Sequence, residues 1–351
     1  MNNLSVMTAW SAMLLLAGCA TTPDATNTTS AATTAEVFAS GETEAVGTAN
    51  ADAADDPAIW RNPRKPAASL IIGTDKKAGL YVYGLDGKRR DFVDAGRVNN
   101  VDLRDGVAIG GRPGILVAAS DRNDELHAKI ALFRLDPTTA KLTSLGTVAA
   151  GDGEAYGICL TRVKGAAHAF VVMKDGTINQ VAIDLAAATP AGRIVRTMKL
   201  GTQSEGCAVD DRTAKLYVAE EDVGLWRFDA RTDGPVEPVS IAKVDGTRLV
   251  ADAEGVAIAP IGRSGGYVLV SSQGDNAYAA WRLSDGAYAG RFRIAQGQFG
   301  STEETDGIDL MLGNFGRDYP TGIFVAQDGH TPDGAQNFKL VRWDAIAKLI
   351  K

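Results

Sequence analysis

A short pattern that recurs six times is the strongest constraint on how this chain folds. Each copy begins with an acidic or amide residue that leads into a small apolar segment, and two apolar segments separated by a polar loop follow. The six lead segments are Asp55–Trp60, Asn99–Leu103, Ala155–Ile158, Glu205–Val209, Glu254–Ile258 and Asp306–Leu310. The period of roughly 45 to 55 residues is typical of propeller blades and solenoids.

Within each repeat, the apolar residues predict a pair of β-strands. The pairs begin near Leu70, Ile115, Phe170, Leu216, Val268 and Ile323. In the first pair, the apolar run Leu70–Ile72 and the alternating run Leu80–Tyr83 flank the polar loop Asp75–Lys77. Asp-Gly pairs such as Asp86-Gly87 mark tight turns. A helical pattern is confined to the last turn at Trp343–Ile350, so we predict an all-β chain.

Six such repeats predict a six-bladed β-propeller. The length of 351 residues and the even spacing, without an internal low-complexity linker, favour a single domain over 35–351. Closing the repeats into a ring leaves few exposed sheet edges. In an antiparallel blade, the start of the first strand and the loop between the second and third lie on one face. We therefore expect all six lead segments and all six polar loops at one mouth of the central channel.

This arrangement gathers acidic side chains at the predicted mouth. The acids at these positions are Asp55, Asp56, Glu154, Glu205, Glu221, Asp252, Glu254, Asp306 and Asp328. Clustered carboxylates raise one another's pKa, and a bound metal ion compensates their charge. Ligand sets made only of oxygen favour Ca²⁺. The three histidines, His127, His168 and His330, form no recognisable pair, which argues against zinc or two-histidine iron sites.

Basic residues fall in the first three loops of the same face. They are Lys76, Lys77, Arg122 and Lys174. Cations beside metal-binding carboxylates suit a small ligand with several negative charges, such as a phosphorylated compound. The net charge of −7 and the pI near 5.1 argue against non-specific nucleic-acid binding, which needs a basic face.

The N-terminus predicts export. An apolar run from Met13 ends in Leu-Ala-Gly-Cys at Cys19, which resembles a bacterial lipoprotein signal, although no Lys or Arg precedes the run. We predict a signal over 1–19 with Cys19 lipidated, and a disordered tether over 20–34 rich in Thr, Ala and Ser. An ordinary cleaved signal would send the chain along the same route. The expected location is the outer membrane, the periplasm or the medium.

The two cysteines of the predicted domain, Cys159 and Cys207, both lie in lead segments where a small apolar residue packs. We expect buried free thiols without a chemical role. Neighbouring blades permit a bridge between these positions but do not require one.

An ordered series of motifs resembles the β-propeller phytases. The motifs are Asp52–Trp60, Asn99–Asp102, Glu205-Gly206, Ala219–Asp222, Ser271–Gly274, Thr305–Asp309 and Phe324–Gly329. The resemblance runs from about Glu42 to the C-terminus. It implies a six-bladed propeller that uses calcium to hydrolyse phytate, myo-inositol hexakisphosphate, to lower inositol phosphates and phosphate.

The resemblance also implies roles for individual residues. Calcium would be held or oriented by Glu44, Asp55, Asp56, Glu205, Glu221, Asp252, Glu254, Asp306, Gln327 and Asp328. We assign catalysis to Lys76, Arg122, Tyr156, Lys174 and Glu205, and substrate binding to Lys76, Lys77, Arg122 and Lys174. The family has one further aspartate upstream of Thr305, where this chain reads Gln298–Glu304. Glu303 or Glu304 would replace that ligand, or one calcium would bind more weakly.

The implied reaction is direct attack by a calcium-activated water on the phosphate monoester, with no protein nucleophile. A calcium-dependent lactonase or esterase on the same fold would not need Lys76, Arg122 and Lys174. A phosphodiesterase would share the metals, and a non-catalytic binding propeller would favour aromatic residues at the mouth. We expect a monomer that acts on a small molecule.

Overall fold

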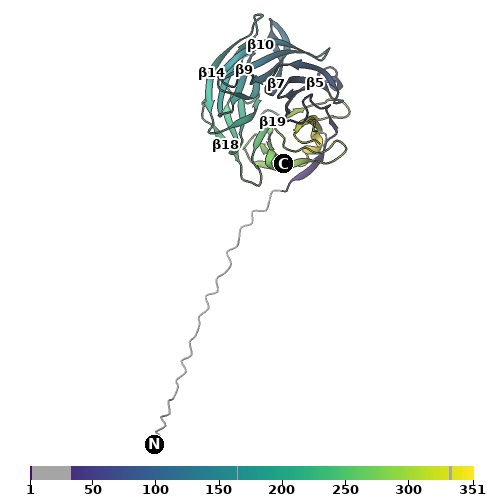
Figure 1. The fold of residues 1–351 in the computed structure, drawn as a ribbon, viewed down its shortest axis with the longest axis vertical. Helices are drawn as coiled ribbons and strands as arrows, with labels where there is room; N and C mark the ends of the chain where they lie inside the picture. Colours follow the sequence, from purple (N-terminus) through teal and green to yellow (C-terminus); the bar gives the residue numbers. More distant parts are fainter. Residues whose placement is uncertain (2–32, 164, 332–333) are drawn as a thin grey trace. The chain divides into compact units, whose positions relative to one another are not determined.

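The repeats fold into six sheets arranged around a central axis, as predicted (Figure 1). The computed structural model describes Met1 and residues 33–163, 165–331 and 334–351. The chain divides into a unit of residues 1–31 and a unit of residues 32–351, and the second unit holds the propeller. Cys19, the predicted signal and all of the predicted tether before Thr33 lie outside the described residues.

Blades 1 to 3 are four-stranded antiparallel sheets whose strands follow one another in the chain. Blade 1 contains β3 (Ala54–Trp60), β4 (Leu70–Asp75), β5 (Gly79–Gly84) and β6 (Arg89–Asp94). Blade 2 contains β7 (Val98–Ile109), β8 (Arg112–Asp121), β9 (His127–Asp136) and β10 (Lys141–Asp152). Blade 3 contains β11 (Ala155–Val163), β12 (Ala166–Met173), β13 (Thr177–Asp184) and β14 (Ala191–Lys199). In each blade the first strand is the innermost, so the lead segments line the axis.

Blades 4 and 5 follow the same order. Blade 4 contains β15 (Ser204–Asp210), β16 (Lys215–Glu220), β17 (Gly224–Asp229) and β18 (Val239–Lys243). Blade 5 contains β19 (Ala253–Ile261), β20 (Gly265–Ser272), β21 (Ala277–Arg282) and β22 (Tyr288–Ala295). Two short 3₁₀ turns, η1 (Pro66–Ala68) and η2 (Gln273–Asp275), and one helix, α1 (Trp343–Ile346), complete the described elements. The helix lies within the segment Trp343–Ile350 that the sequence indicated.

The N-terminal segment closes the ring at blade 6. This blade takes β23 (Ile308–Leu312), β24 (Gly322–Asp328) and β25 (Asn337–Arg342) from the end of the chain, and β2 (Gly41–Glu42) pairs antiparallel with β25 as its outer strand. A further strand, β1 (Ala35–Phe38), adds in parallel to β22 of blade 5. The two ends of the domain are therefore held in adjacent blades, which leaves no free seam in the ring.

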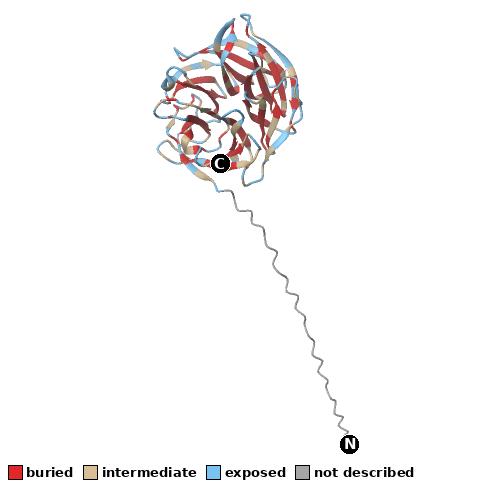
Figure 2. Cartoon of the chain, turned by 180° about the vertical axis from the view of Figure 1, so that it is seen from behind, coloured by how far each residue is buried: buried red, intermediate tan, exposed pale blue. Residues whose placement is uncertain are grey.

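The hydrophobic core consists of six wedges, one between each pair of neighbouring blades. Figure 2 shows the buried strands facing the inside of the ring and the exposed loops at its rim. In the wedge between blades 3 and 4, Phe170 and Leu216 are fully buried. Truncating such a side chain costs about 2 to 5 kcal/mol, so each wedge contributes to holding its two blades together.

The expectation of free thiols is wrong. Cys159 on β11 and Cys207 on β15 form a disulfide with a Cα–Cα distance of 5.8 Å. The inner strands of neighbouring blades approach each other near the axis, where the wedge between them is narrowest. Two cysteines in successive lead segments therefore meet across the boundary between blades 3 and 4.

Among the described residues, no helix has the length and apolar character needed to cross a membrane.

Candidate functional site

Irregular pairing at the start of the inner strands determines where the lead residues lie. The register between the first and second strands shifts at Ala54/Pro57, Val98/Val101, Ala155/Gly157, Ser204/Cys207 and Ala253/Val256. A β-bulge re-aims the residues that it contains. Asp55, Tyr156, Glu205 and Glu254 all lie inside these bulges. In blades 1 to 5 the recurrent motif is thus a recurrent bulge at the start of the inner strand, whereas Asp306 of blade 6 lies just before β23.

Glycines that follow the acids let these segments come close together. A Cβ atom on Gly206 would lie 2.3 Å from the carbonyl oxygen of Glu254, and one on Gly255 would lie 2.6 Å from that of Asp306. The amide of Gly255 also donates to the carbonyl oxygen of Asp306 over 2.8 Å. Only glycine permits this approach, which brings the acids of blades 4, 5 and 6 together at the axis.

Three glutamates form the centre of the mouth. One carboxylate oxygen from each of Glu205, Glu221 and Glu254 lies within 4.8 Å of the others, and all three side chains are buried. Asp55 is also buried, and neither of its oxygens has a hydrogen-bond partner among the described residues. One oxygen each of Glu221 and Glu254 likewise has none. We call Asp55, Glu205, Glu221 and Glu254 the mouth carboxylates.

The environment of the mouth carboxylates disfavours their charged form. Burial, with the nearby carboxylates of Asp306 and Asp52, raises the pKa of Asp55 to about 7 despite the opposing effect of Lys76. Burial also raises the pKa of Glu221 to about 7. For Glu205 and Glu254, burial and the neighbouring acids raise the pKa well above its ordinary range. Oxygen donors without partners in such a setting fit a hard cation.

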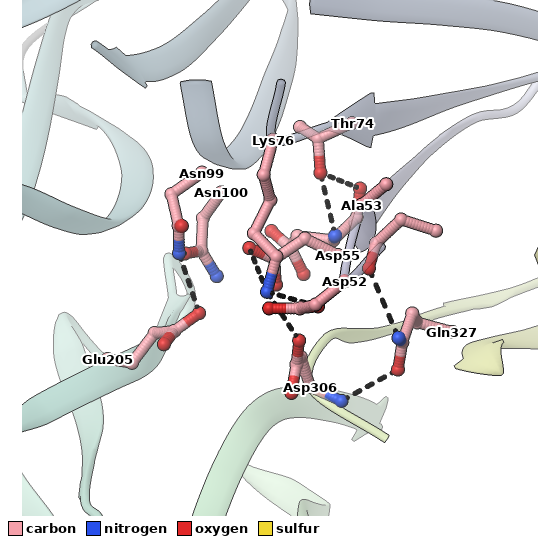
Figure 3. Close-up of polar contacts among 12 residues, drawn as sticks. Asp52, Ala53, Asp55, Thr74, Lys76, Asn99, Asn100, Glu205, Asp306 and Gln327 are labelled. Atoms are coloured by element: carbon pink, nitrogen blue, oxygen red, sulfur yellow. Dashed lines mark hydrogen bonds and ion pairs between the residues drawn. The ribbon is translucent and has the colours of Figure 1, made fainter. Parts of the chain in front are cut away.

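Lys76 supplies the cation of the first loop. Its Nζ lies 2.8 Å from Asp52 and 2.9 Å from Asp306, and 3.9 Å from Asp55 (Figure 3). Burial alone would lower the pKa of Lys76, but these carboxylates raise it above its ordinary value. The ammonium is therefore charged and held at the edge of the mouth carboxylates.

Two more of the predicted cations, Arg122 and Lys174, flank Tyr156. Arg122 donates to Asn99 and Glu154, and its guanidinium lies 5.3 Å from the centre of the Tyr156 ring. The Nζ of Lys174 lies 5.2 Å from the same ring. Burial, followed by the charge of Glu205, raises the pKa of Tyr156, so the phenol stays protonated. The two cations and the phenol together form a donor surface for an anion.

Lys77, Glu44 and Gln327 were also predicted to belong to the site. Lys77 is exposed, and its side chain has no hydrogen bond or ion pair among the described residues. Glu44 accepts a hydrogen bond from the amide of Arg89. The amide oxygen of Gln327 accepts from the backbone of Asp306, and its nitrogen donates to Ala54. These contacts give Gln327 a supporting position behind Asp306.

Asp252 directly precedes β19 of blade 5, and Asp328 ends β24 of blade 6. Asp252 is half-buried, and its charge contributes to the raised pKa of Glu221, which places it beside the mouth. Asp328, at the end of β24, forms an ion pair with Lys339 over 3.2 Å. Of the ten predicted metal ligands, six thus lie around the mouth (Asp55, Glu205, Glu221, Asp252, Glu254 and Asp306) and Gln327 lies behind Asp306, whereas Glu44 and Asp328 lie apart from them.

Asp56, next to Asp55, belongs to a second group of carboxylates deeper in the channel. We call Asp56, Asp102 and Asp309 the wall carboxylates. Each accepts a backbone hydrogen bond from a neighbouring blade: Asp56 from Val101 (3.0 Å), Asp102 from Leu160 (2.7 Å) and Asp309 from Ile59 (2.8 Å). Their oxygens connect the inner strands of blades 1 and 2, blades 2 and 3, and blades 6 and 1.

Four residues that the sequence interpretation left without a role contribute to the site. Asp52 pairs with Lys76, and Gln273 donates a hydrogen bond to Asp306. Asn99 connects Arg122 to Glu205. Glu42 pairs with Lys339, which also binds Asp328. Asn99 occupies the same place in its repeat as the lead acids, which is the signal that could have identified it. Asp52 and Gln273 lie in two of the motifs that resemble the β-propeller phytases, but their contacts depend on the turns around them.

A polar cavity of about 770 Å³ adjoins this arrangement. Asp52, Gln273, Asp306, His330 and Gln336 are among the residues that line it. Two of these residues, Asp52 and Asp306, pair with Lys76, so the cavity lies next to this lysine. Lys76 in turn lies beside the mouth carboxylates. A second cavity, of about 520 Å³, lies among the inner strands near Asp102 and Asp309.

Comparison with known proteins agrees with this geometry. A family model described as Phytase matches residues 3–351. The chain is also 39% identical over 328 residues to the 3-phytase of Bacillus subtilis (strain 168), an alignment that covers 89% of this chain and 85% of that protein.

Proposed function

Since this chain belongs to the phytase family, we propose that it is a calcium-dependent phosphomonoesterase that hydrolyses phytate to lower inositol phosphates and phosphate. One observation carries the proposal. Buried carboxylate oxygens without partners, on Asp55, Glu221 and Glu254, lie beside the paired cations Lys76 and Arg122. This combination suits a phosphate group bound between metal ions and basic side chains.

The donor set of the mouth fits calcium. Asp55, Glu205, Glu221 and Glu254 would hold the ions, since their oxygens are close together and lack enough protein donors. When bound, calcium supplies positive charge that offsets the phosphate dianion and lowers the pKa of a water molecule. The chain's own contribution is to exclude bulk water from these carboxylates and to fix their positions through the bulges of the inner strands.

The basic residues bind and orient the substrate. Lys76 and Arg122 are charged and already held by carboxylates, so phosphoryl oxygens would replace part of those contacts. Lys174, which is less buried, extends this surface toward solvent. Tyr156, a neutral phenol between the two cations, would donate a hydrogen bond to a phosphoryl oxygen.

Phosphate release from phytate, measured with calcium and with chelator, tests the proposal. We expect release only with calcium, and expect Lys76→Ala combined with Arg122→Ala to abolish it without altering the calcium-dependent melting transition. A matched control is Lys199→Ala with Arg231→Ala, which removes two exposed cations that pair with Asp175 and Asp229, away from the mouth. Absence of release with calcium would remove the phytase assignment, and release indifferent to chelator would remove the calcium mechanism.

We also propose that the protein is exported and carries a lipid on Cys19. The Leu-Ala-Gly-Cys sequence supports this, and so does the disulfide between Cys159 and Cys207, because such bonds persist in oxidising compartments. Mass spectrometry of the mature N-terminus tests lipidation.

A monomer is proposed for the mature protein, and sedimentation would test it.

A further inference from the structure

A buried lysine lies where the ring closes, in a cage of oxygen atoms. Lys339 on β25 is 3% exposed. Its Nζ lies 2.6 Å from Glu42 Oε2, 3.0 Å from Asn337 Oδ1 and 3.2 Å from Asp328 Oδ2. The three oxygens come from β2, β25 and the end of β24, so the ammonium connects the first and last segments of the domain.

Strand register produces this cage. Glu42 lies directly opposite Lys339 in the β2–β25 pair, and Asn337 lies opposite Asp328 in the β24–β25 pair. Side chains two residues apart on one strand point to the same face, so Lys339 and Asn337 both reach the side on which Asp328 lies. The contacts therefore follow from the pairing that closes the ring.

Two carboxylates and an amide oxygen are also ligands that a calcium ion prefers. At the mouth, comparable oxygens lack partners among the described residues. Around Lys339 the oxygens do have partners. Asp328 Oδ2 binds the ammonium, and Asp328 Oδ1 accepts hydrogen bonds from the amides of Glu303 and His330, both over 3.3 Å. The donor set here is already satisfied by the protein.

The segment 298–304 faces the same ammonium. A Cβ atom on Gly300 would lie 3.5 Å from Cε and 3.6 Å from Nζ of Lys339, so the segment presents a glycine at this point. Glu303 and Glu304 are exposed, and their side chains make no contact with the cage in the described part of the chain. In the described part of the chain, neither glutamate side chain is among the oxygens that bind Lys339.

We propose that the ammonium of Lys339 is the resident cation of the pocket formed by Glu42, Asp328 and Asn337, in place of a calcium ion. Closure of the ring is then independent of calcium, whereas the mouth depends on it. The proposal uses the proposed calcium site at the mouth only as a contrast. Its tests therefore measure metal content and melting, and not phosphate release.

The first test compares bound calcium per chain, by elemental analysis after dialysis, in the wild type, Asp328→Asn and Glu254→Gln. If Lys339 is the resident cation, Asp328→Asn keeps the wild-type calcium content, while Glu254→Gln at the mouth lowers it. Loss of one calcium in Asp328→Asn would overturn the proposal. If the wild type binds no calcium, the calcium mechanism proposed for the mouth fails, and the second test decides the role of Lys339.

The second test removes the ammonium. Lys339→Met leaves Glu42 and Asp328 without their cation, so we expect a melting temperature that is low in chelator and restored by calcium, with one more calcium bound than in the wild type. Lys339→Arg keeps the charge and should gain no calcium. Equal calcium content and equal calcium response in Lys339→Met and the wild type would overturn the proposal. Should Lys339→Met fail to fold even with calcium, calcium cannot replace the ammonium, which also contradicts the shared-ligand argument.

Discussion

The mouth carboxylates and the wall carboxylates are both groups of acids around the axis of the ring, and β3 contributes one residue to each, yet their surroundings differ. Asp55 is buried and has no hydrogen-bond partner within the part of the chain that the structure describes, whereas its neighbour Asp56 accepts a hydrogen bond from Val101 of the next blade. Unpaired oxygens require a cation from outside, and paired oxygens hold blades together. Burial of an acid in a propeller channel therefore does not by itself indicate a metal ligand; the partner of each oxygen does.

Removing a mouth carboxylate should have the largest effect on activity. Glu254→Gln is expected to lower phosphate release on the order of 100-fold, because charge that stabilises the transition state is lost with the metal. In chelator the unfolding free energy should stay equal or increase, since a buried carboxyl group with an oxygen that lacks a partner among the described residues is replaced by a neutral amide. Kinetics with phytate and chemical denaturation measure the two effects, and a large loss of stability in chelator would contradict the distinction.

Removing a wall carboxylate should have the opposite profile. Asp309→Ala leaves the amides of Ile59 and Leu310 without their acceptor, so we expect a loss of about 1 to 3 kcal/mol in unfolding free energy. The turnover number of the folded enzyme should remain near that of the wild type. Asp309→Asn keeps an oxygen acceptor and serves as the control. A drop in turnover without a drop in stability would place Asp309 in the catalytic machinery.

A smaller effect should appear in the pH dependence of stability. The folded-state pKa of about 7 for Asp55 and Glu221 lies above the ordinary values of 3.8 and 4.5. In chelator the folded protein therefore binds more protons than the unfolded chain, and stability falls as the pH rises from about 4 through 7. With calcium the trend reverses, because the ligands bind the ion when deprotonated. Melting temperatures across this range test the sign, and parallel curves with and without calcium would refute it.

The repeat made most of this fold predictable from the sequence. All six second strands contain the residues at which the strand pairs were expected to begin, from Leu70 to Ile323. Ring closure was not predictable in the same way. The closing strand β2 has two residues, which is too short for an alternating pattern to be recognised.

The same limit applies to individual residues, whose contacts depend on strand register. Glu42 and Glu44 are two residues apart and face the same side of an extended chain. Only the register with β25 shows that Glu42 is the one opposite Lys339. Asp55 and Asp56 were both predicted to bind metal, and the bulge between Ala54 and Pro57 decides which of them pairs with the next blade. Tyr156 entered only through the family resemblance, because a single aromatic residue at a lead position has no charge pattern to reveal it.

The pairing of β2 with β25 also sets the order in which the protein is completed during synthesis. Glu42 and its partner Asn337 are 295 residues apart. At about 5 to 20 residues per second, a ribosome needs roughly 15 to 60 s to pass from one to the other. Until then, the apolar wedge between blades 6 and 1 has only one of its two sides. The nascent chain therefore carries an open hydrophobic surface for nearly the whole of its synthesis, and holding it unassembled until the last strand emerges is a task for a chaperone.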